Sequence, residues 1–330
     1  MLTYLEDLSE KFGSLRCLII GDVMVDAYLW GKVDRISPEA PVPVFEVKTR
    51  ENRLGGAANV ALNVKSLGAE PFLVGVVGAD VKGEIFQQLL KESAISEQAI
   101  VVDHKRPTTS KTRIISGSHH MLRVDEEYQG FISPEVEAKV FEQVEKVLTQ
   151  GVDVAIFEDY DKGLLSPQFI QRLVQVCKQY KVPTCVDPKK NNFSAYKGVS
   201  VFKPNFKEFL EGVKLEVQKD DFDQIGRIAK TFLKENNIQS MLITLSEQGM
   251  LLVDDKETTR VPAMIRNIAD VSGAGDTVIS TYALALAAGF SANERLVLAN
   301  LAGGLVCEEV GVVPVAIEKL QEEFQRKSKG

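Results

Sequence analysis

Short apolar runs alternate with segments of helical periodicity along the chain. The runs occupy residues 16–22, 72–77, 154–157, 184–186, 199–202 and 241–245. Continuous apolar runs of this length are typical of strands that are buried on both faces of a sheet. Between the runs, apolar side chains recur every three or four residues, which indicates helices with one buried stripe.

Two of the predicted helices carry start signals. Ser133 and Ser166 each precede a proline and then an apolar stripe. We expect each serine to cap its helix and each proline to occupy the first helical position. Repeated alternation of strand and helix predicts right-handed βαβ units. The expected fold is therefore α/β, with a central, mostly parallel sheet, helices on both faces, and a ligand site at the carboxyl ends of the strands.

Two segments interrupt this alternation, at about residues 27–53 and 108–127. The second resembles a hairpin with polar residues at its turn. We expect the strands of both segments to leave the main sheet and to form a small β lid over the site. Neither a repeat nor a clear boundary is visible, so residues 1–330 are expected to form a single domain with these lid strands inserted.

Composition and charge exclude several classes of partner. The net charge is -7 and no Lys/Arg run stands out, which disfavours a nucleic-acid partner. Glu6, Asp7 and Glu10 interrupt the N-terminal segment, which predicts an amphipathic helix rather than a signal peptide. The longest apolar stretch, residues 278–290, is shorter than the roughly 18 residues of a membrane span and predicts a buried helix. With four scattered cysteines, we expect a cytoplasmic protein without a membrane partner.

The strongest chemical signal is the sequence DVSGAGDT at residues 270–277, directly before an apolar helical pattern. Gly273 and Gly275 permit close approach of the backbone to an anion, and the amides at a helix start attract phosphate oxygens. Asp276 would then lie beside that phosphate and accept a proton from an incoming hydroxyl. Gly273, Ala274 and Gly275 would stabilise the transferred group. The alternative is a tight turn in which Asp276 interacts only with the helix dipole.

Two further motifs suit an uncharged polyol. Asp22 and Asp26 follow a predicted strand, and each carboxylate can accept hydrogen bonds from sugar hydroxyls. Gly55 and Gly56 open a predicted helix and permit close backbone contact with a ligand, while Asn59 offers both a donor and an acceptor. The aspartates can equally form a turn, and the glycines can equally begin a tightly packed helix.

Polar and charged residues follow two other predicted strands. Asn205 and Glu208 are three residues apart, share a face of one helical turn and can orient Mg²⁺ through water. A helix cap with Glu208 at its third position explains the same residues. Lys189, after Asp187 and Pro188, can act as a point charge for phosphate, although a surface lysine is the simpler interpretation.

The motifs at residues 55–59 and 270–276 together resemble the two signatures of the ribokinase-like (phosphofructokinase B) sugar kinases, in order, spacing and chain length. Within that family the chain is most similar to D-glycero-D-manno-heptose 7-phosphate kinase domains. The resembling stretches lie at residues 34–47, 55–63, 109–116, 159–163, 242–250 and 270–277.

The resemblance implies a ribokinase-like enzyme that transfers the γ-phosphoryl group of ATP to the anomeric hydroxyl of heptose 7-phosphate, for lipopolysaccharide heptose synthesis. Asp276 would be the base and residues 273–275 the anion hole. The implied substrate-binding residues are Asp22, Asp26, Gly55, Gly56, Asn59, Lys111, Arg113, Arg123, Asp159 and Lys189, of which Lys111, Arg113 and Arg123 would meet the 7-phosphate. The implied residues for ATP and Mg²⁺ are Asn205, Glu208 (to the metal through water), Thr244, Ser246, Gly249, Gly273, Gly275 and Asn300. The family also implies a homodimer joined by its lid strands.

The chain departs from the family pattern at two positions: Glu158 replaces a more common serine, and Lys203 replaces a usual threonine. Bifunctional relatives continue into a nucleotidyltransferase with an H-x-G-H motif, which is absent here, so we expect a kinase alone. The alternatives are a ribokinase-type or fructokinase-type enzyme, a non-catalytic sugar-sensing module and a dinucleotide-dependent oxidoreductase. The basic set of Lys111, Arg113 and Arg123 favours a phosphorylated sugar, and the intact Asp276 favours an enzyme.

Overall fold

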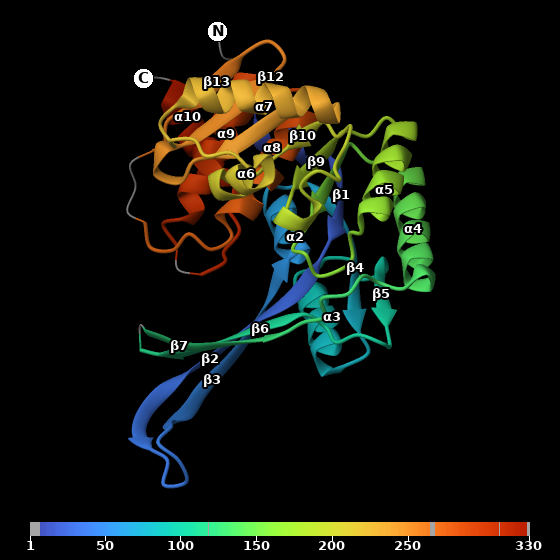
Figure 1. Cartoon of the computed structure of the whole chain (residues 1–330). Coiled ribbons are helices and arrows are strands. Elements are labelled where there is room, and N and C mark those ends of the chain that lie inside the picture. The colour runs from blue at the N-terminus through green and yellow to red at the C-terminus, as the bar shows by residue number, and fades with distance from the viewer. Residues whose placement is uncertain (1–6, 118, 265–267, 310, 329–330) are drawn as a thin grey trace.

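A large twisted sheet forms the centre of the protein in the computed structural model, which describes residues 7–117, 119–264, 268–309 and 311–328 (Figure 1). Within these residues the strand order is β13-β12-β11-β10-β9-β8-β1-β4-β5. The strands from β11 to β5 run parallel, and β12 and β13 are antiparallel additions at one edge. The strands are β1 (Arg16–Gly21), β4 (Glu70–Gly78), β5 (Ile100–Asp103), β8 (Val154–Glu158), β9 (Thr184–Asp187), β10 (Val201–Phe202), β11 (Ser240–Thr244), β12 (Met250–Asp254) and β13 (Thr258–Val261).

Helices cover both faces of this sheet, as the sequence predicted. Side chains alternate across a strand, so Cys17 and Ile19 of β1 enter one core while Leu18 and Ile20 enter the other. The first core is shared by α1 (Leu8–Gly13), α2 (Ala57–Ser66), α3 (Val81–Glu92), α8 (Ala274–Ala287), α9 (Ala292–Val306) and α10 (Ile317–Ser328). The second is shared by α4 (Pro134–Thr149), α5 (Pro167–Gln179), α6 (Phe206–Val213) and α7 (Phe222–Asn236), and two short 3₁₀ turns occupy Lys190–Asn192 and Ser246–Gln248.

The predicted helix starts are confirmed. The Ser133 side chain accepts a hydrogen bond from the amide of Val136, and Ser166 accepts one from Phe169, each with proline at the start of the helix. The apolar stretch at residues 278–290 lies largely in α8, which is buried between α2 and α9. The N-terminal helix begins at Leu8, and residues 1–6 lie outside the described residues. In the part of the chain that the structure describes, each helix is too short or too polar to cross a bilayer.

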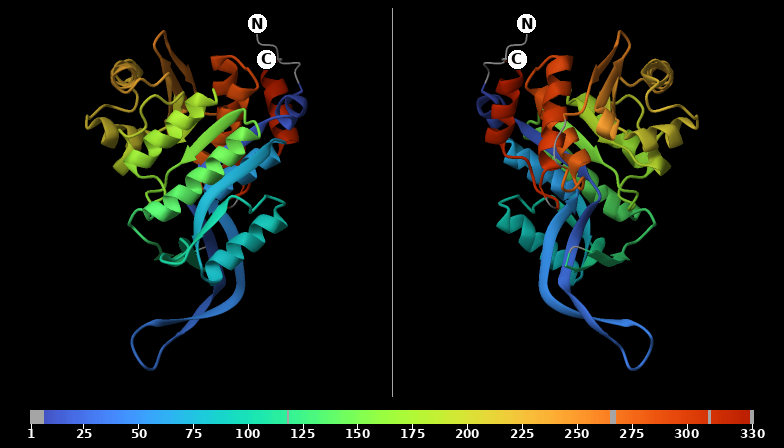
Figure 2. Two further views of the ribbon diagram at one scale, coloured as in Figure 1. Left: turned by 90° about the vertical axis from the view of Figure 1, so that its right-hand side faces the viewer. Right: turned by 90° about the vertical axis from the view of Figure 1, so that its left-hand side faces the viewer.

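Four strands leave the main body and form the predicted lid, in the order β3-β2-β6-β7. They are β2 (Val23–Ile36), β3 (Pro43–Gly56), β6 (Ser110–Ser116) and β7 (His119–Glu126). Figure 2 shows β2 and β3 as a long ribbon that projects away from the body. The ribbon extends beyond the predicted residues 27–53 at both ends. It begins earlier because β2 follows β1 after one residue, Asp22, and it ends later because β3 runs directly into α2. β6 and β7 form the expected antiparallel hairpin.

The sequence did not indicate β5, β12 and β13. The β12–β13 pair is a local antiparallel addition after β11, so it needs no crossover helix and lies outside the strand–helix alternation. Residues 262–264, which follow β13, lead towards α8 and its glycine-rich start.

Candidate active site

The glycine-rich motif forms the start of α8 at the carboxyl edge of the sheet. Gly273 has a φ of 76°, a left-handed conformation that favours glycine, and α8 begins at the next residue. A Cβ at Gly273 would lie 3.1 Å from both Nδ2 of Asn59 and Cγ1 of Val312. The amide of Ala274 donates to the carbonyl of Val271 at 3.3 Å. The motif therefore makes a tight turn into a helix start, and its role as an anion hole stays a prediction.

Asp276 lies in the first turn of α8 and is only 6% exposed. Nδ2 of Asn59 donates to its Oδ2 at 2.6 Å, and the hydroxyl of Tyr160 donates to its Oδ1 at 3.1 Å. Burial raises the pKa of Asp276 to about 6, with the charge of Asp187 adding to the rise and the Asn59 hydrogen bond opposing it. A carboxylate with this pKa is suited to accept a proton at neutral pH.

A polar network fixes α2 against α8 beneath this carboxylate. The side chain of Asn63 donates to the carbonyl of Asn59 at 2.9 Å, and the hydroxyl of Thr277 donates to Oδ1 of Asn63 at 2.9 Å. Because each donor has a partner, the rotamer of Asn59 is held where it meets Asp276. The two glycine motifs recognised in the sequence therefore meet through one buried contact.

Two more carboxylates lie beside Asp276. Glu158 ends β8, Asp187 ends β9, and one oxygen from each of Glu158, Asp187 and Asp276 lies within 4.8 Å of the others. Burial, and then the charge of Asp187, raises the pKa of Glu158 well above its usual range. Burial also disfavours ionised Asp187, but Lys189 and Lys203 outweigh it and lower the pKa of Asp187.

Lysines surround this carboxylate cluster. Nζ of Lys203, a residue only 2% exposed, lies 2.8 Å from Oδ2 of Asp187. A Cβ at Gly275 would lie 3.6 Å from the same Nζ, so the ammonium group lies directly beside the predicted anion hole. Lys189 joins Asp187 at 3.4 Å and Glu208 at 2.8 Å. Phosphate oxygens at the start of α8 would thus meet fixed positive charge.

Residues 14–319 match the profile of the pfkB family carbohydrate kinases. The chain belongs to this family. It is an enzyme that transfers a phosphoryl group to an alcohol of a carbohydrate, and kinases of this family use ATP. The family and the ribokinase-like fold that the sequence suggested are thereby confirmed.

Curated relatives of this kinase include bifunctional HldE proteins. The chain is 39% identical to the one from Nitratiruptor sp. over 94% of its length, and 42% identical to the one from Caulobacter vibrioides over 96%. In both cases it spans 65% of the relative's length, less than two thirds. Among solved structures, phosphofructokinase-2 from Escherichia coli matches with a TM-score of 0.79 at 19% identity, covering 96% of this chain and 99% of that one. Arabidopsis thaliana ribokinase, solved with ribose and ATP, matches with 0.71 at 17%, covering 94% and 99%.

Tyr160, Glu158 and Lys203 of this kinase are site residues that the sequence did not assign. The ring of Tyr160 is close to two ammonium groups, with Nζ of Lys111 5.3 Å and Nζ of Lys189 5.1 Å from its centroid. Lys111 belongs to the lid strand β6. Because Tyr160 contacts Lys111 and also donates to Asp276, it connects the lid to Asp276. The sequence offered one indication, because residues 158 and 203 depart from the family pattern. Glu158 lies in the carboxylate cluster, and Lys203 lies at its edge.

The structure gives Asp22 a role that the sequence did not indicate. Its carboxylate accepts hydrogen bonds from the amides of Tyr160, Lys162 and Leu164 at 3.0–3.1 Å. Asp22 therefore holds the loop that carries Tyr160, and its contact with a sugar stays a prediction. Asp159 contacts Asn192 and Tyr196 rather than the acidic cluster, and burial raises its pKa to about 6.

The other predicted sugar residues lie at the base of the lid. Asp26 of β2 pairs with Arg113 of β6 at 2.6 Å. Gly55 lies against that pair, because a Cβ there would be 2.3 Å from Oδ2 of Asp26, and Gly56 adopts a φ of 60° at the start of α2. Arg123 of β7 lies opposite Arg113 but is exposed and pairs with Asp125.

The predicted nucleotide residues form a second group. Asn205 caps α6 and makes a capping box with Glu208, so the helix-cap interpretation is confirmed. Thr244 pairs with Asn205 through an isolated bridge. Ser246 and Gly249 have left-handed backbones in the turn between β11 and β12. A Cβ at Gly249 would lie 2.1 Å from the carbonyl oxygen of Val261, and Asn300 of α9 donates to the nearby carbonyl of Pro262 at 3.0 Å.

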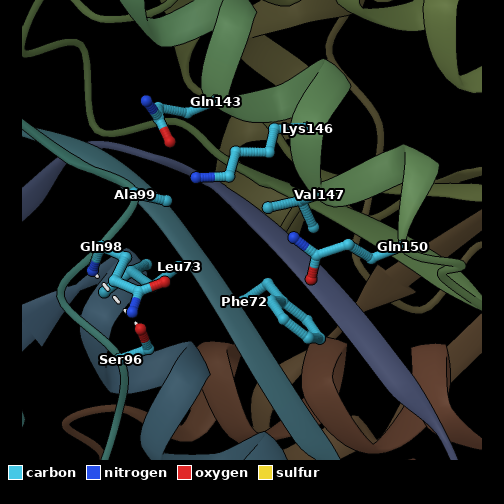
Figure 3. Close-up of a pocket in the computed structure, with 9 residues that line it drawn as sticks. All are labelled: Phe72, Leu73, Ser96, Gln98, Ala99, Gln143, Lys146, Val147 and Gln150. Atoms are coloured by element: carbon cyan, nitrogen blue, oxygen red, sulfur yellow. Dashed lines mark hydrogen bonds between the residues drawn. The ribbon is translucent and has the colours of Figure 1, made fainter.

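A separate pocket lies between α4, the strand β4 and the segment 96–99 that precedes β5 (Figure 3). Its lining includes Phe72, three glutamines and Lys146. None of its nine lining residues is a carboxylate or one of the residues that surround Asp276. It is therefore distinct from the active site.

Proposed function

We propose that this carbohydrate kinase transfers the γ-phosphoryl group of ATP to the anomeric hydroxyl of D-glycero-D-manno-heptose 7-phosphate. The product, the 1,7-bisphosphate, would serve lipopolysaccharide heptose synthesis. The choice of sugar is supported by the similarity to HldE proteins over almost the whole chain. Phosphoryl transfer itself rests on one observation: buried Asp276 at the start of α8, with an ammonium group beside the same helix start.

Asp276 is the proposed base. Its two oxygens already accept from Asn59 and Tyr160, which orient the carboxylate and leave lone pairs for the acceptor hydroxyl. The hydroxyl proton passes to Asp276 as the oxygen attacks the γ-phosphorus, and the bond from that phosphorus to the β,γ-bridging oxygen breaks with ADP as the leaving group. General-base catalysis of this kind is typically worth about 10²–10⁴ in rate.

The transferred phosphoryl group is proposed to lie at the start of α8. Amides of residues 273–275 and the helix dipole stabilise the charge that develops on its oxygens. Lys203 and Lys189 add two fixed positive charges, and both are held in place by Asp187. These groups are pre-organised by burial, so little reorganisation accompanies the reaction.

Mg²⁺ accompanies ATP in this proposal, where it neutralises phosphate charge. The donor set fits, because the carboxylates of Asp187 and Glu208 both contact Lys189, and Asp187 also lies beside the start of α8. Glu208 would hold the ion through water. Its Oε1 binds Lys189 and its Oε2 accepts from the amide of Asn205, so the side chain is fixed while each oxygen keeps a free lone pair. Thr244, Ser246, Gly249 and Asn300 would surround the adenine.

The lid is proposed to recognise the 7-phosphate. Lys111 and Arg113 are neighbours on β6, and Arg123 lies opposite Arg113 on β7, so three cationic side chains belong to one hairpin. Burial lowers the pKa of Lys111, although nearby Asp26 opposes the change. A dianionic phosphate would offset the mutual repulsion of these cations.

The lid is also the proposed dimer interface. β7 is an edge strand and exposes Met121, Leu122 and Val124. An exposed apolar edge strand is a template for pairing with another chain. A second copy of the same strand would cover it.

The test is a comparison of kcat/KM for heptose 7-phosphate, fructose 6-phosphate, fructose and ribose, with ATP and Mg²⁺ and ADP release as the readout. We expect heptose 7-phosphate to exceed the unphosphorylated sugars by at least about 100-fold, because only a phosphorylated sugar would bring an anionic group to Lys111, Arg113 and Arg123. A preference for ribose or fructose would instead favour the ribokinase-type or fructokinase-type alternative. Lys111→Met should raise KM for the sugar phosphate while leaving KM for ribose nearly unchanged.

A further inference from the structure

Glu158 is an ionisable residue that the proposed reaction does not use. It lies at the end of β8, which pairs with β1 on one side and β9 on the other, and is 0% exposed. Neither oxygen of its carboxyl group has a hydrogen-bond partner among the described residues. Burial of a carboxylate without a partner is strongly unfavourable. The group therefore requires either a proton or a cation.

The unpartnered group is directed into the acidic cluster. Glu158, Asp187 and Asp276 come from three elements, the ends of β8 and β9 and the start of α8, and their oxygens lie within 4.8 Å of one another. Asp187 accepts from two lysines, and Asp276 accepts from Asn59 and Tyr160. A carboxylate has about four lone-pair sites. Asp187 and Asp276 thus keep some unused lone pairs, and all the lone pairs of the Glu158 carboxylate are unused among the described residues.

Charge balance favours a cation over a proton. The cluster and its ion pairs contain four carboxylates, Glu158, Asp187, Glu208 and Asp276, and two ammonium groups, those of Lys189 and Lys203. With all groups ionised, four negative and two positive charges leave -2. A single divalent cation neutralises this charge, whereas one proton on Glu158 leaves half of it.

We infer that Glu158 and Asp187 bind a divalent cation, Mg²⁺ or Mn²⁺, directly and before the nucleotide arrives, and that Asp276 contacts this cation through water. Carboxylate oxygens are the ligands that these hard cations prefer, and water completes the coordination. The inference goes beyond the proposed function, in which Mg²⁺ enters with ATP and reaches Glu208 through water. Glu158, whose carboxyl oxygens have no hydrogen-bond partner in the described part of the chain, is the ligand that distinguishes this site.

The test is a titration of the full chain with Mn²⁺, without ATP or sugar, in which electron paramagnetic resonance measures free Mn²⁺. We expect one strong site per chain, from which Mg²⁺ displaces Mn²⁺. Glu158→Gln should weaken this site by at least about tenfold. Glu137→Gln is the matched control, because Glu137 pairs with Arg172 on the surface of α4. It should bind Mn²⁺ as the natural chain does.

Two results would overturn the inference. If the natural chain shows no strong site, Glu158 is a buried neutral acid. If Glu158→Gln and the natural chain bind Mn²⁺ equally, the ion is held by other carboxylates. Circular dichroism melting checks the fold of each variant, and Glu158→Ser removes the ligand without adding an amide donor. Because the titration contains neither sugar nor ATP, its outcome is independent of which sugar the kinase phosphorylates.

Discussion

Asn59 donates a 2.6 Å hydrogen bond to Asp276, although the two residues are 217 positions apart. The contact joins the start of α2 to the start of α8. It therefore connects the two glycine motifs, one of which is proposed to contact the sugar and the other the phosphate. A carboxylate held from both sides, by Asn59 and Tyr160, cannot turn away from the acceptor hydroxyl without losing a buried hydrogen bond.

Asp276→Asn should abolish most turnover and spare nucleotide binding. Asparagine is close to aspartate in size and keeps the helix start, but its amide cannot accept a proton from the acceptor. We expect kcat to fall by at least about 10². Steady-state kinetics measures the loss, and calorimetric titration with a non-hydrolysable ATP analogue checks that the dissociation constant changes little. Turnover near that of the natural chain would contradict the assignment of the base.

The pH dependence of kcat should report the same group. Burial raises the pKa of Asp276 to about 6, so the carboxylate is ionised above that pH and protonated below it. Only the ionised form can act as a base. We expect kcat to fall about tenfold for each pH unit below 6 and to level off above 7. A rate that is constant from pH 5 to pH 8 would show that proton transfer to Asp276 does not limit the reaction.

Tyr160→Phe should move that acidic limb to higher pH. The tyrosine hydroxyl donates to Asp276 and favours its ionised form, and its removal therefore raises the pKa further. The ring, which contacts Lys111 and Lys189, is retained. Loss of one hydrogen bond of about 1 kcal/mol corresponds to a shift of somewhat less than one pH unit. An unchanged profile would place the hydroxyl outside the reaction.

The sequence predicted most of the fold because its signals are local. Apolar runs, Ser-Pro helix starts and the glycine motifs are each contained in a few residues, and Asp276 and Asn59 were recognised in this way. Glu158, Tyr160 and Lys203 were not assigned because their importance depends on which strand ends lie side by side in the folded sheet. Glu158 ends β8, Tyr160 follows the same strand, and Lys203 follows β10; only the parallel order of β8, β9 and β10 brings those ends together. The hydrogen bonds from three amides to Asp22 could not be predicted either, because they depend on the conformation of the loop that carries those amides.

Lys203→Met should destabilise the protein by leaving buried negative charge without its partner. The ammonium group lies 2.8 Å from Asp187, and both side chains are almost fully buried. Removing one member of such a pair typically costs about 3–5 kcal/mol of unfolding free energy. Urea denaturation measures the loss.

The double variant Lys203→Met with Glu158→Gln should recover part of that stability. Glu158 lies close enough to Lys203 for their charges to influence each other's pKa, so removing both charges leaves the cluster less negative than removing the lysine alone. We expect a coupling energy of about 0.5–3 kcal/mol between the two positions. Strict additivity of the two single changes would show that the residues are independent.

Leu122→Asp should dissociate the proposed dimer. Leu122 is 58% exposed on the edge strand β7, between Met121 and Val124, which are also exposed. A carboxylate at the centre of this strand would be desolvated if a second copy covered it, so association would weaken. Light scattering coupled to size-exclusion chromatography measures the mass. Leu215→Asp, which changes an exposed leucine just after α6, is the matched control and should leave the mass unchanged. Equal masses for the natural chain and both variants would show that β7 does not hold two copies together.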